Sequence, residues 1–384
     1  MQKKVYLDHS ATTPLDQEVF QSMQPFFFSA FGNASSNHVF GKEANSAITE
    51  ARKTISNLLN ATPEEIYFLS GGTEADNLAV KGFVYKNRQK GNHIITTPTE
   101  HPAVLNTCLE LEKEGFDVSF LPVDKYGQVD PEAVKKAIKR STILISVIHG
   151  NNEIGTINPI REIGQIAGEV GVAFHTDAVQ SFGKIPINVE KMNISLLSIS
   201  GHKFYGPKGT GVLYIRKGIS VKNLLNGGSH EKGIRPGTEN VPGIVGMAKA
   251  AQLSHDRMSV YQTKIGNLRN YFQEKLLAQF EDVKINGHPT NRLYHNLNVC
   301  FPGFDSGMLL AHMDKFGIAA SNGSACASHS IEPSHVLRAI GLTFEEANSS
   351  IRFTLGKDNT REDIDYVLTV LESIVRRVPK ANII

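Results

Sequence analysis

The stretch Ile194-Ser195-Leu196-Leu197-Ser198-Ile199-Ser200-Gly201-His202-Lys203-Phe204 joins an apolar run to a lysine. The run Ile194–Ile199 predicts a buried strand, so Lys203 follows almost directly after an element of the core. An ammonium group is costly to bury unless it has a chemical role. A Schiff base with a carbonyl cofactor is such a role. The stretch therefore predicts a core strand whose end carries a chemically active lysine.

The sequence around this stretch has the alternation of an α/β protein. Helical patterns such as Val104–Glu114 and Pro131–Lys139 separate short β-rich runs. These runs are Ile66–Leu69, His93–Thr96, Val118–Leu121, Ile143–Ile148, Val172–Thr176, Leu196–Ser200 and Gly211–Ile215. The alternation predicts a mainly parallel central sheet flanked by helices.

The length of 384 residues suits two domains. A glycine-rich passage from Gly227 to Gly237 precedes a long helical pattern at Ile244–Gln279, after which strands become fewer. We expect a large domain at 14–258 and a smaller α+β domain made of 1–13 and 259–384. The segment after Asp363 is expected to form one amphipathic helix.

The charge balance and the cysteine content limit the classes of function. Forty basic and 38 acidic residues nearly cancel, which argues against a nucleic-acid-binding surface or a polybasic membrane anchor. Three cysteines without paired metal spacing indicate a reducing compartment, by default the cytoplasm. The N-terminus has no secretory signal, and no run reaches the roughly 18–20 apolar residues of a membrane span. We expect a soluble protein that acts on small molecules.

A glycine-rich segment, Ser70-Gly71-Gly72-Thr73-Glu74, follows a predicted strand and opens a helix. The backbone N–H groups of such a helix start, together with the Thr73 hydroxyl, are able to bind a phosphate. A plain turn with an N-capping threonine is the alternative.

Asp177 and Gln180 follow another predicted strand, at the sheet edge where open α/β sheets bind ligands. A carboxylate there would keep a pyridinium nitrogen protonated and make the ring an electron sink, and Gln180 would bond the ring oxygen. The alternatives are a helix cap for Asp177 and a solvated side chain for Gln180. The lysine, the phosphate site and this carboxylate together predict pyridoxal phosphate as the cofactor.

Other polar residues also follow predicted strands. His101 is suited to stacking on a cofactor ring and to moving protons near neutral pH, or else it is a capping or surface histidine. Asn151-Asn152 would bind the cofactor or a substrate carboxylate, or form an ordinary turn. Arg352 is able to bind a carboxylate with two N–H groups, or to form a surface salt bridge.

The three cysteines differ in their surroundings. Cys326 lies in Ser321-Asn322-Gly323-Ser324-Ala325-Cys326-Ala327-Ser328, a small and polar stretch that predicts an exposed loop and a nucleophilic thiol. Cys108 on a helical pattern and Cys300 in the predicted strand Leu297–Phe301 are expected to be small buried side chains.

Taken together, the motifs resemble one family across nearly the whole chain. The sequence is similar to group I cysteine desulfurases of the NifS/IscS type, within the class V aminotransferases of fold-type I. The resemblance rests on SGGTEADN, TEHPAV, NNEIG, HTDAVQ, SGHKFYGPKG, RPGTEN and GSACAS in this order.

The resemblance implies a role for each matching residue. Lys203 would hold pyridoxal 5'-phosphate, Asp177 would pair with its ring nitrogen, and His101 would stack on the ring. Asn152 and Gln180 would contact the ring oxygen or substrate, Arg352 would bind the substrate carboxylate, and Cys326 would accept sulfur. The phosphate would be held by Gly72, Thr73, Ser200, His202 and, across a homodimer interface, by Thr238.

The implied reaction converts L-cysteine to L-alanine and leaves a persulfide on Cys326. The acceptors implied for this sulfur are iron–sulfur scaffold proteins and tRNA thiolation enzymes. The resemblance also allows Cys326 to contact a nascent cluster in a scaffold complex, although the sequence contains no stand-alone metal site.

The loop departs from the family pattern at Asn322, Ala327 and His329, which leaves the choice of acceptor open. A coupling of His329 to the Cys326 thiolate and a solvated loop histidine are equally compatible with the sequence. The alternative functions are a selenocysteine lyase and a non-catalytic sulfur-relay subunit.

Overall fold

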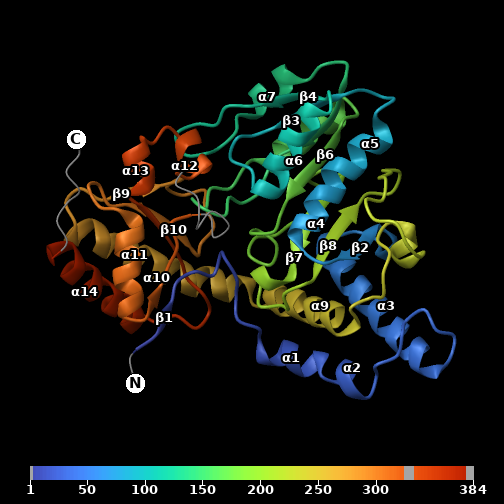
Figure 1. The fold of residues 1–384 in the computed structure, drawn as a ribbon, viewed down its shortest axis with the longest axis horizontal. Coiled ribbons are helices and arrows are strands. Elements are labelled where there is room, and N and C mark those ends of the chain that lie inside the picture. Colours follow the sequence, from blue (N-terminus) through green and yellow to red (C-terminus); the bar gives the residue numbers. More distant parts are fainter. Residues whose placement is uncertain (1–2, 324–332, 378–384) are drawn as a thin grey trace.

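The computed structural model describes residues 3–323 and 333–377 (Figure 1). A seven-stranded central sheet has the order β2-β8-β7-β6-β5-β3-β4. In this sheet β8 is antiparallel to both of its neighbours, and the other pairs are parallel. The mainly parallel sheet is thus confirmed. Its strands are β2 (Ile66–Leu69), β3 (His93–Thr96), β4 (Asp117–Phe120), β5 (Thr142–Ser146), β6 (Ala173–Asp177), β7 (Leu196–Ser200) and β8 (Gly211–Ile215).

Side-chain alternation along the strands builds a core on each face of this sheet. Ile145 and Leu197 belong to one core, and the preceding residues Leu144 and Leu196 belong to the other. The first core packs against α1 (Gln17–Met23), α3 (Val39–Leu59), α7 (Pro131–Ala137), α8 (Ile160–Glu169) and α9 (Val241–Asp256). The second packs against α4 (Gly72–Asn77), a π-helical turn (Leu78–Gly82), α5 (Phe83–Asn87) and α6 (Pro102–Lys113).

Some predicted element ends are wrong, for local reasons. The strand predicted to reach Ile148 ends at Ser146, and beyond it the Ile148 N–H donates to the Glu100 carboxylate at 2.9 Å while Val147 and His149 still donate to β6 carbonyls. The single long helical pattern is two helices, α9 and α10 (Met258–Gln279), which meet at Arg257. A short helix α2 (Pro25–Phe28) follows α1.

A second, separate core lies beside the sheet (Figure 1). It packs α10, α11 (Ser306–Lys315) and α14 (Arg361–Arg377) against the antiparallel strands β9 (Lys284–Asn286), β10 (Asn296–Cys300) and β12 (Ser350–Thr354). Val5 and Leu7 belong to this core because β1 (Val5–Tyr6) pairs with β11 (Ile318–Ala319). The separate core is compatible with domains of 14–258 and of 1–13 with 259–384, and this division stays a prediction.

Two further short helices are α12 (His335–Ala339) and α13 (Phe344–Asn348), and two 3-10 turns lie at Pro63–Glu65 and His230–Gly233. Within residues 3–323 and 333–377, no helix combines the length and the apolar composition that a membrane span requires.

Candidate active site

A cavity of about 230 Å³ lies at the carboxyl ends of β6 and β7. It brings together ten of the predicted site residues, which come from segments far apart in the sequence. These are Gly72, Thr73, His101, Asn152, Asp177, Gln180, Ser200, His202, Lys203 and Arg352. Thr238 does not line this cavity and is exposed. Cys326 and His329 lie outside the described residues.

Lys203 ends a 3-10 turn (Gly201–Lys203) that directly follows β7. Its Nζ donates to the carbonyl oxygens of Ser10 at 2.7 Å and Ala11 at 2.8 Å. The N-terminal segment, nearly 200 residues earlier in the chain, thus holds the amine at the cavity wall.

Asp177 is the last residue of β6, and its carboxylate is buried in the cavity. Burial raises its pKa to about 6, while the N–H of Val179, at 2.8 Å, and the charge of Lys203 act in the opposite direction. The bond to the N–H two residues later closes a tight turn after the strand. The carboxylate therefore retains an acceptor oxygen beside the cavity.

Gln180 and Arg352 are buried, so a solvated glutamine and a surface salt bridge are both wrong. Gln180 Nε2 donates to Ser10 O at 2.8 Å. Arg352 donates to Asp8 Oδ1 at 2.8 Å and to the Asn152 carbonyl at 3.0 Å. Because burial would be costly for an unpaired guanidinium, Asp8 compensates its charge while the side chain remains at the cavity.

The cavity fits pyridoxal phosphate by the chemistry of its unpaired atoms. Gln180 Oε1, Asp76 Oδ1 and Arg352 Nε are buried without a hydrogen-bond partner in the described part of the chain. Buried polar atoms require partners, so a polar ligand is expected here. A Cβ atom at Gly72 would lie only 2.9 Å from Val179 Cγ2. The close approach therefore favours glycine here, and the cavity wall at Gly72 is formed by backbone alone. An amine, a carboxylate, hydroxyl groups and an imidazole complete a donor set that suits this cofactor.

His101 caps α6, as one of the alternatives predicted, and it also lines the cavity, so a contact with a cofactor stays a prediction. Its Nδ1 accepts the N–H of Ala103 at 3.1 Å, which places the ring proton on Nε2. Burial, with the charges of Lys203 and His335, lowers its pKa to about 4. His101 is therefore a neutral ring at physiological pH.

The two asparagines of the NNEIG motif separate into different roles. Asn151 Oδ1 accepts the N–H groups of Glu153 and Ile154, and its Nδ2 donates to Thr99 O. Asn151 thus shapes the turn, and Asn152 lines the cavity.

Two ionisable residues of the site were not predicted from the sequence. Asp76 lines the cavity from α4. Lys184 is buried, and its Nζ donates to the carbonyl oxygens of Gln180 at 2.9 Å and Lys203 at 3.1 Å. It therefore ties the turn after β6 to the turn that carries Lys203. The signal available in the sequence was a lysine seven residues after Asp177, within a strongly apolar segment.

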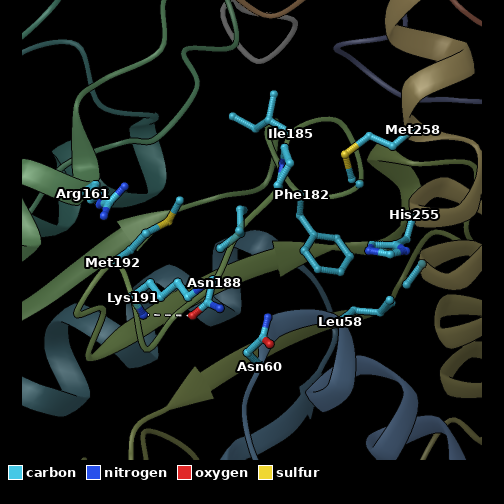
Figure 2. Close-up of a pocket in the computed structure, with 14 residues that line it drawn as sticks. Leu58, Asn60, Arg161, Phe182, Ile185, Asn188, Lys191, Met192, His255 and Met258 are labelled. Atoms are coloured by element: carbon cyan, nitrogen blue, oxygen red, sulfur yellow. Dashed lines mark hydrogen bonds between the residues drawn. The ribbon is translucent and has the colours of Figure 1, made fainter.

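A separate cavity of about 330 Å³ lies beside the segment that follows β6 and is drawn in Figure 2. Phe182, Gly183 and Ile185 line it, together with Leu58, Met192 and Met258. None of the predicted site residues within the described ranges lines it. One side of the segment around Lys184 thus faces this cavity, while the Lys184 side chain donates to the Lys203 carbonyl.

Glu100, next to His101, makes the free energy of unfolding depend measurably on pH. Its carboxyl is buried, and burial raises its pKa to about 8 against hydrogen bonds from Ile148 N and Thr97 Oγ1. Because the pKa in the folded protein is above the ordinary value of 4.5, the stability contributed by the protonated form is lost as the pH rises toward 8. We expect Glu100→Gln, which cannot ionise, to lose less unfolding free energy than the wild type over this range.

Urea unfolding of both proteins across this pH range measures the difference. Glu110→Gln, at an exposed position of α6, is the matched control and should follow the wild type. Parallel pH profiles for Glu100→Gln and the wild type would contradict a neutral Glu100.

The sheet order, the lysine after β7 and the carboxylate at the end of β6 define a pyridoxal-phosphate enzyme of fold-type I. The family model of class-V aminotransferases matches residues 5–367. The chain belongs to this family.

Known proteins are similar over nearly the whole chain. "Cysteine desulfurase IscS" of Dictyoglomus turgidum is 51% identical over 378 residues, covering 98% of this chain and 96% of that protein. A solved structure described as a NifS-like protein has a TM-score of 0.93 at 36% identity and covers 98% of this chain and all of that one. A second solved structure, described as "SspA in complex with cysteine", has a TM-score of 0.82 at 40% identity. It covers 92% of this chain and 99% of that one.

Proposed function

We propose that this protein is a pyridoxal-phosphate-dependent cysteine desulfurase. It removes sulfur from L-cysteine, releases L-alanine and carries the sulfur as a persulfide. The observation that carries the proposal is the single cavity that unites Lys203, Asp177 and Arg352 in a chain 51% identical to a cysteine desulfurase. L-Cysteine fits this cavity because the buried Arg352 supplies a partner for its carboxylate.

The lining residues of the cavity would each hold a different part of the cofactor. Lys203 would bind it covalently, Asp177 would pair with its ring nitrogen, and His101 would stack on its ring. Asn152 and Gln180 would contact its ring oxygen or the substrate. Its phosphate would be held by Gly72, Thr73, Ser200 and His202. When bound, the cofactor supplies an electron sink for negative charge at the substrate α-carbon.

The chain's own groups move the proton and bind the substrate. Lys203 Nζ accepts the α-proton of L-cysteine once it is neutral, and the carbonyls of Ser10 and Ala11 keep it oriented. Arg352 orients the substrate carboxylate. His101, neutral with its proton on Nε2, would stack on the cofactor ring without adding a charge.

Cys326 completes the proposed reaction. Its thiolate attacks the sulfur of the substrate, so that an S–S bond forms as the bond between Cβ and sulfur breaks, and the electron pair of that bond stays with the carbon that becomes alanine. One L-cysteine and one thiol thus give one L-alanine and one persulfide. The sulfur then passes to an acceptor, an iron–sulfur scaffold protein or a tRNA thiolation enzyme, and we place the reaction in the cytoplasm.

Assays of alanine and sulfide with L-cysteine and with L-selenocysteine test this function against its alternatives. A desulfurase releases alanine from L-cysteine and needs Cys326, whereas a selenocysteine lyase favours L-selenocysteine and does not need it. A sulfur-relay subunit releases no alanine from either substrate. Equal alanine release from L-cysteine by wild type and Cys326→Ser would overturn the role of the thiol.

A homodimer that shares its active sites is also part of the proposal. Thr238 is exposed on a loop that two ion pairs anchor, Arg52 to Glu231 at 2.6 Å and Arg235 to Glu74 at 3.2 Å. Glu231 and Lys232 have positive φ angles of 45° and 57°, so the anchored loop holds an unfavourable backbone shape. Such a fixed and exposed loop is suited to completing the phosphate site of a second subunit.

Mixing subunits tests this sharing. A Lys203→Ala subunit combined with a Thr238→Ala subunit should form heterodimers with one native site, because each parent lacks a different half of it. We expect alanine release above the sum of the parents, measured after unfolding and refolding the mixture. A mixture of Lys203→Ala with Lys203→Met is the control and should show no recovery. Purely additive activities would count against a shared site.

A further inference from the structure

Asp76 places a second buried carboxyl group in the proposed cofactor site. It lies on α4, four residues after Gly72, with 1% of its surface exposed, and it lines the cavity. One polar atom each of Asp76, His101 and Asp177 lies within 4.8 Å of the other two. The carboxylate proposed to face the ring nitrogen therefore has a carboxyl neighbour from another element.

The ionisable groups around Asp76 provide no strong counter-charge. From β6, His175 Nε2 lies 3.7 Å from Asp76 Oδ1. The two His175 nitrogens bond Ser146 Oγ at 2.8 Å and Ser198 Oγ at 3.1 Å. Burial lowers the pKa of His175 to about 3, so this ring is neutral.

The remaining neighbours are acidic or neutral. Glu100 and Asp177 repel a negative charge on Asp76, and His101 is neutral. The positive charge of Lys203, from the turn after β7, acts on Asp177. Within residues 3–323 and 333–377, no lysine or arginine forms an ion pair with Asp76.

Two carboxylates at this separation in a buried site do not both ionise, because like charges repel strongly where water is excluded. Asp177 has the better stabilised charge, since it accepts the Val179 N–H and feels the positive charge of Lys203. A charge on Asp76 is stabilised by the Ser198 hydroxyl but, within the described residues, by no ion pair with a lysine or arginine. Asp76 has an oxygen, Oδ1, with no hydrogen-bond partner in the described chain. Burial and the charge of Asp177 raise its pKa well above the usual range.

We propose that Asp76 and Asp177 form a carboxyl pair that holds one proton, with Asp76 as the protonated member. Asp76 is then a positioning residue. It fixes the charge of the pair at one negative unit and places this charge on Asp177. Only the identity of the group that Asp177 faces, the ring nitrogen of the cofactor, rests on the proposed function. The position of the proton follows from the described residues alone.

Infrared difference spectroscopy of the cofactor-loaded protein at neutral pH tests the position of the proton. The wild type should show the C=O band of a protonated carboxyl, and Asp76→Asn should lose it. Glu100→Gln is the matched control, because it removes a different protonated carboxyl and should leave the Asp76 band in place. If Asp76→Asn does not fold, carbon-13 labelling of all aspartates in the wild type should shift this band and leave that of Glu100 unshifted.

A second measurement separates a neutral Asp76 from a merely structural one. Asparagine has the size of a neutral aspartic acid, so Asp76→Asn should retain the visible cofactor band at neutral pH, whereas Asp177→Asn should lose it. As the pH rises above the ordinary aspartate pKa of 3.8, the wild type should lose unfolding free energy that Asp76→Asn retains, because the folded protein holds the pKa of Asp76 well above that value.

Either of two results would overturn the proposal. One is an unchanged protonated-carboxyl band in Asp76→Asn or in the labelled wild type. The other is an Asp76→Asn protein that loses its cofactor as completely as Asp177→Asn. The infrared result requires no turnover of L-cysteine, so failure of the proposed function would leave it intact and is recognised separately by the absence of alanine.

Discussion

Lys203→Ala is expected to lower alanine release from L-cysteine by at least about 10²–10⁴-fold, the range for loss of a general acid–base group. The loss should be larger still because the same amine is proposed to bind the cofactor covalently. Two backbone carbonyls hold the Nζ atom at the cavity wall, and Lys203 is the one lysine among the described residues that lines the cavity. The buried amine of Lys184 instead donates to the carbonyls of Gln180 and Lys203.

The measurement is alanine release together with the visible spectrum of the purified protein. The wild type should be yellow, and Lys203→Ala should lose turnover even where it retains cofactor noncovalently. Lys208→Ala is the matched control, because Lys208 is an exposed lysine in the same SGHKFYGPKG stretch. A colourless wild type that still releases alanine would disprove the role of Lys203.

Cys326→Ser is expected to abolish the protein persulfide, because a hydroxyl neither attacks sulfur effectively nor stores it. The other two cysteines are poorly suited to replace Cys326. Cys108 and Cys300 are buried, and burial raises the pKa of their thiols to about 12 and about 11. A thiol with such a pKa has almost no thiolate at neutral pH, so neither residue is suited to accept sulfur.

Mass spectrometry of the protein after incubation with L-cysteine measures the persulfide and its position. Cys108→Ser and Cys300→Ser are the matched controls and should both carry the extra sulfur on Cys326. Cofactor absorbance should be the same in all three variants. A persulfide on Cys108 or Cys300 in the Cys326→Ser protein would contradict the assignment.

Much of this site was predictable because its residues follow strands. Lys203 and Asp177 occur at the ends of apolar runs, and parallel strands bring such ends to one edge of the sheet. The residue pattern alone left Asn151 and Asn152 open, and only the family resemblance pointed to Asn152, because the choice depends on which side chain the turn uses in its own hydrogen bonds. The sequence also allowed a solvated side chain for Gln180 and a surface salt bridge for Arg352, and only the burial of these residues excludes both alternatives.

The residues that sequence reasoning missed depend on packing between distant segments. Asp76 is unusual only because α4 brings it beside Asp177, a hundred residues later in the chain. Lys184 is unusual only because its amine is enclosed against Lys203. Neither residue type nor spacing predicts such ionisation behaviour, since it arises from the exclusion of water by several elements at once.

The N-terminal segment also determines when during biosynthesis the site is completed. Ser10 and Ala11 hold Lys203, and the segment that contains them is fixed by bonds such as that from Ser10 N to Thr354 Oγ1, 344 residues apart in the chain. The residues around Ser10 thus wait for β12, which is synthesised after the whole central sheet, before they reach their places. A ribosome-bound chain that ends before β12 should therefore lack the arrangement around Lys203, and we expect the cofactor to bind only after β12 has been made.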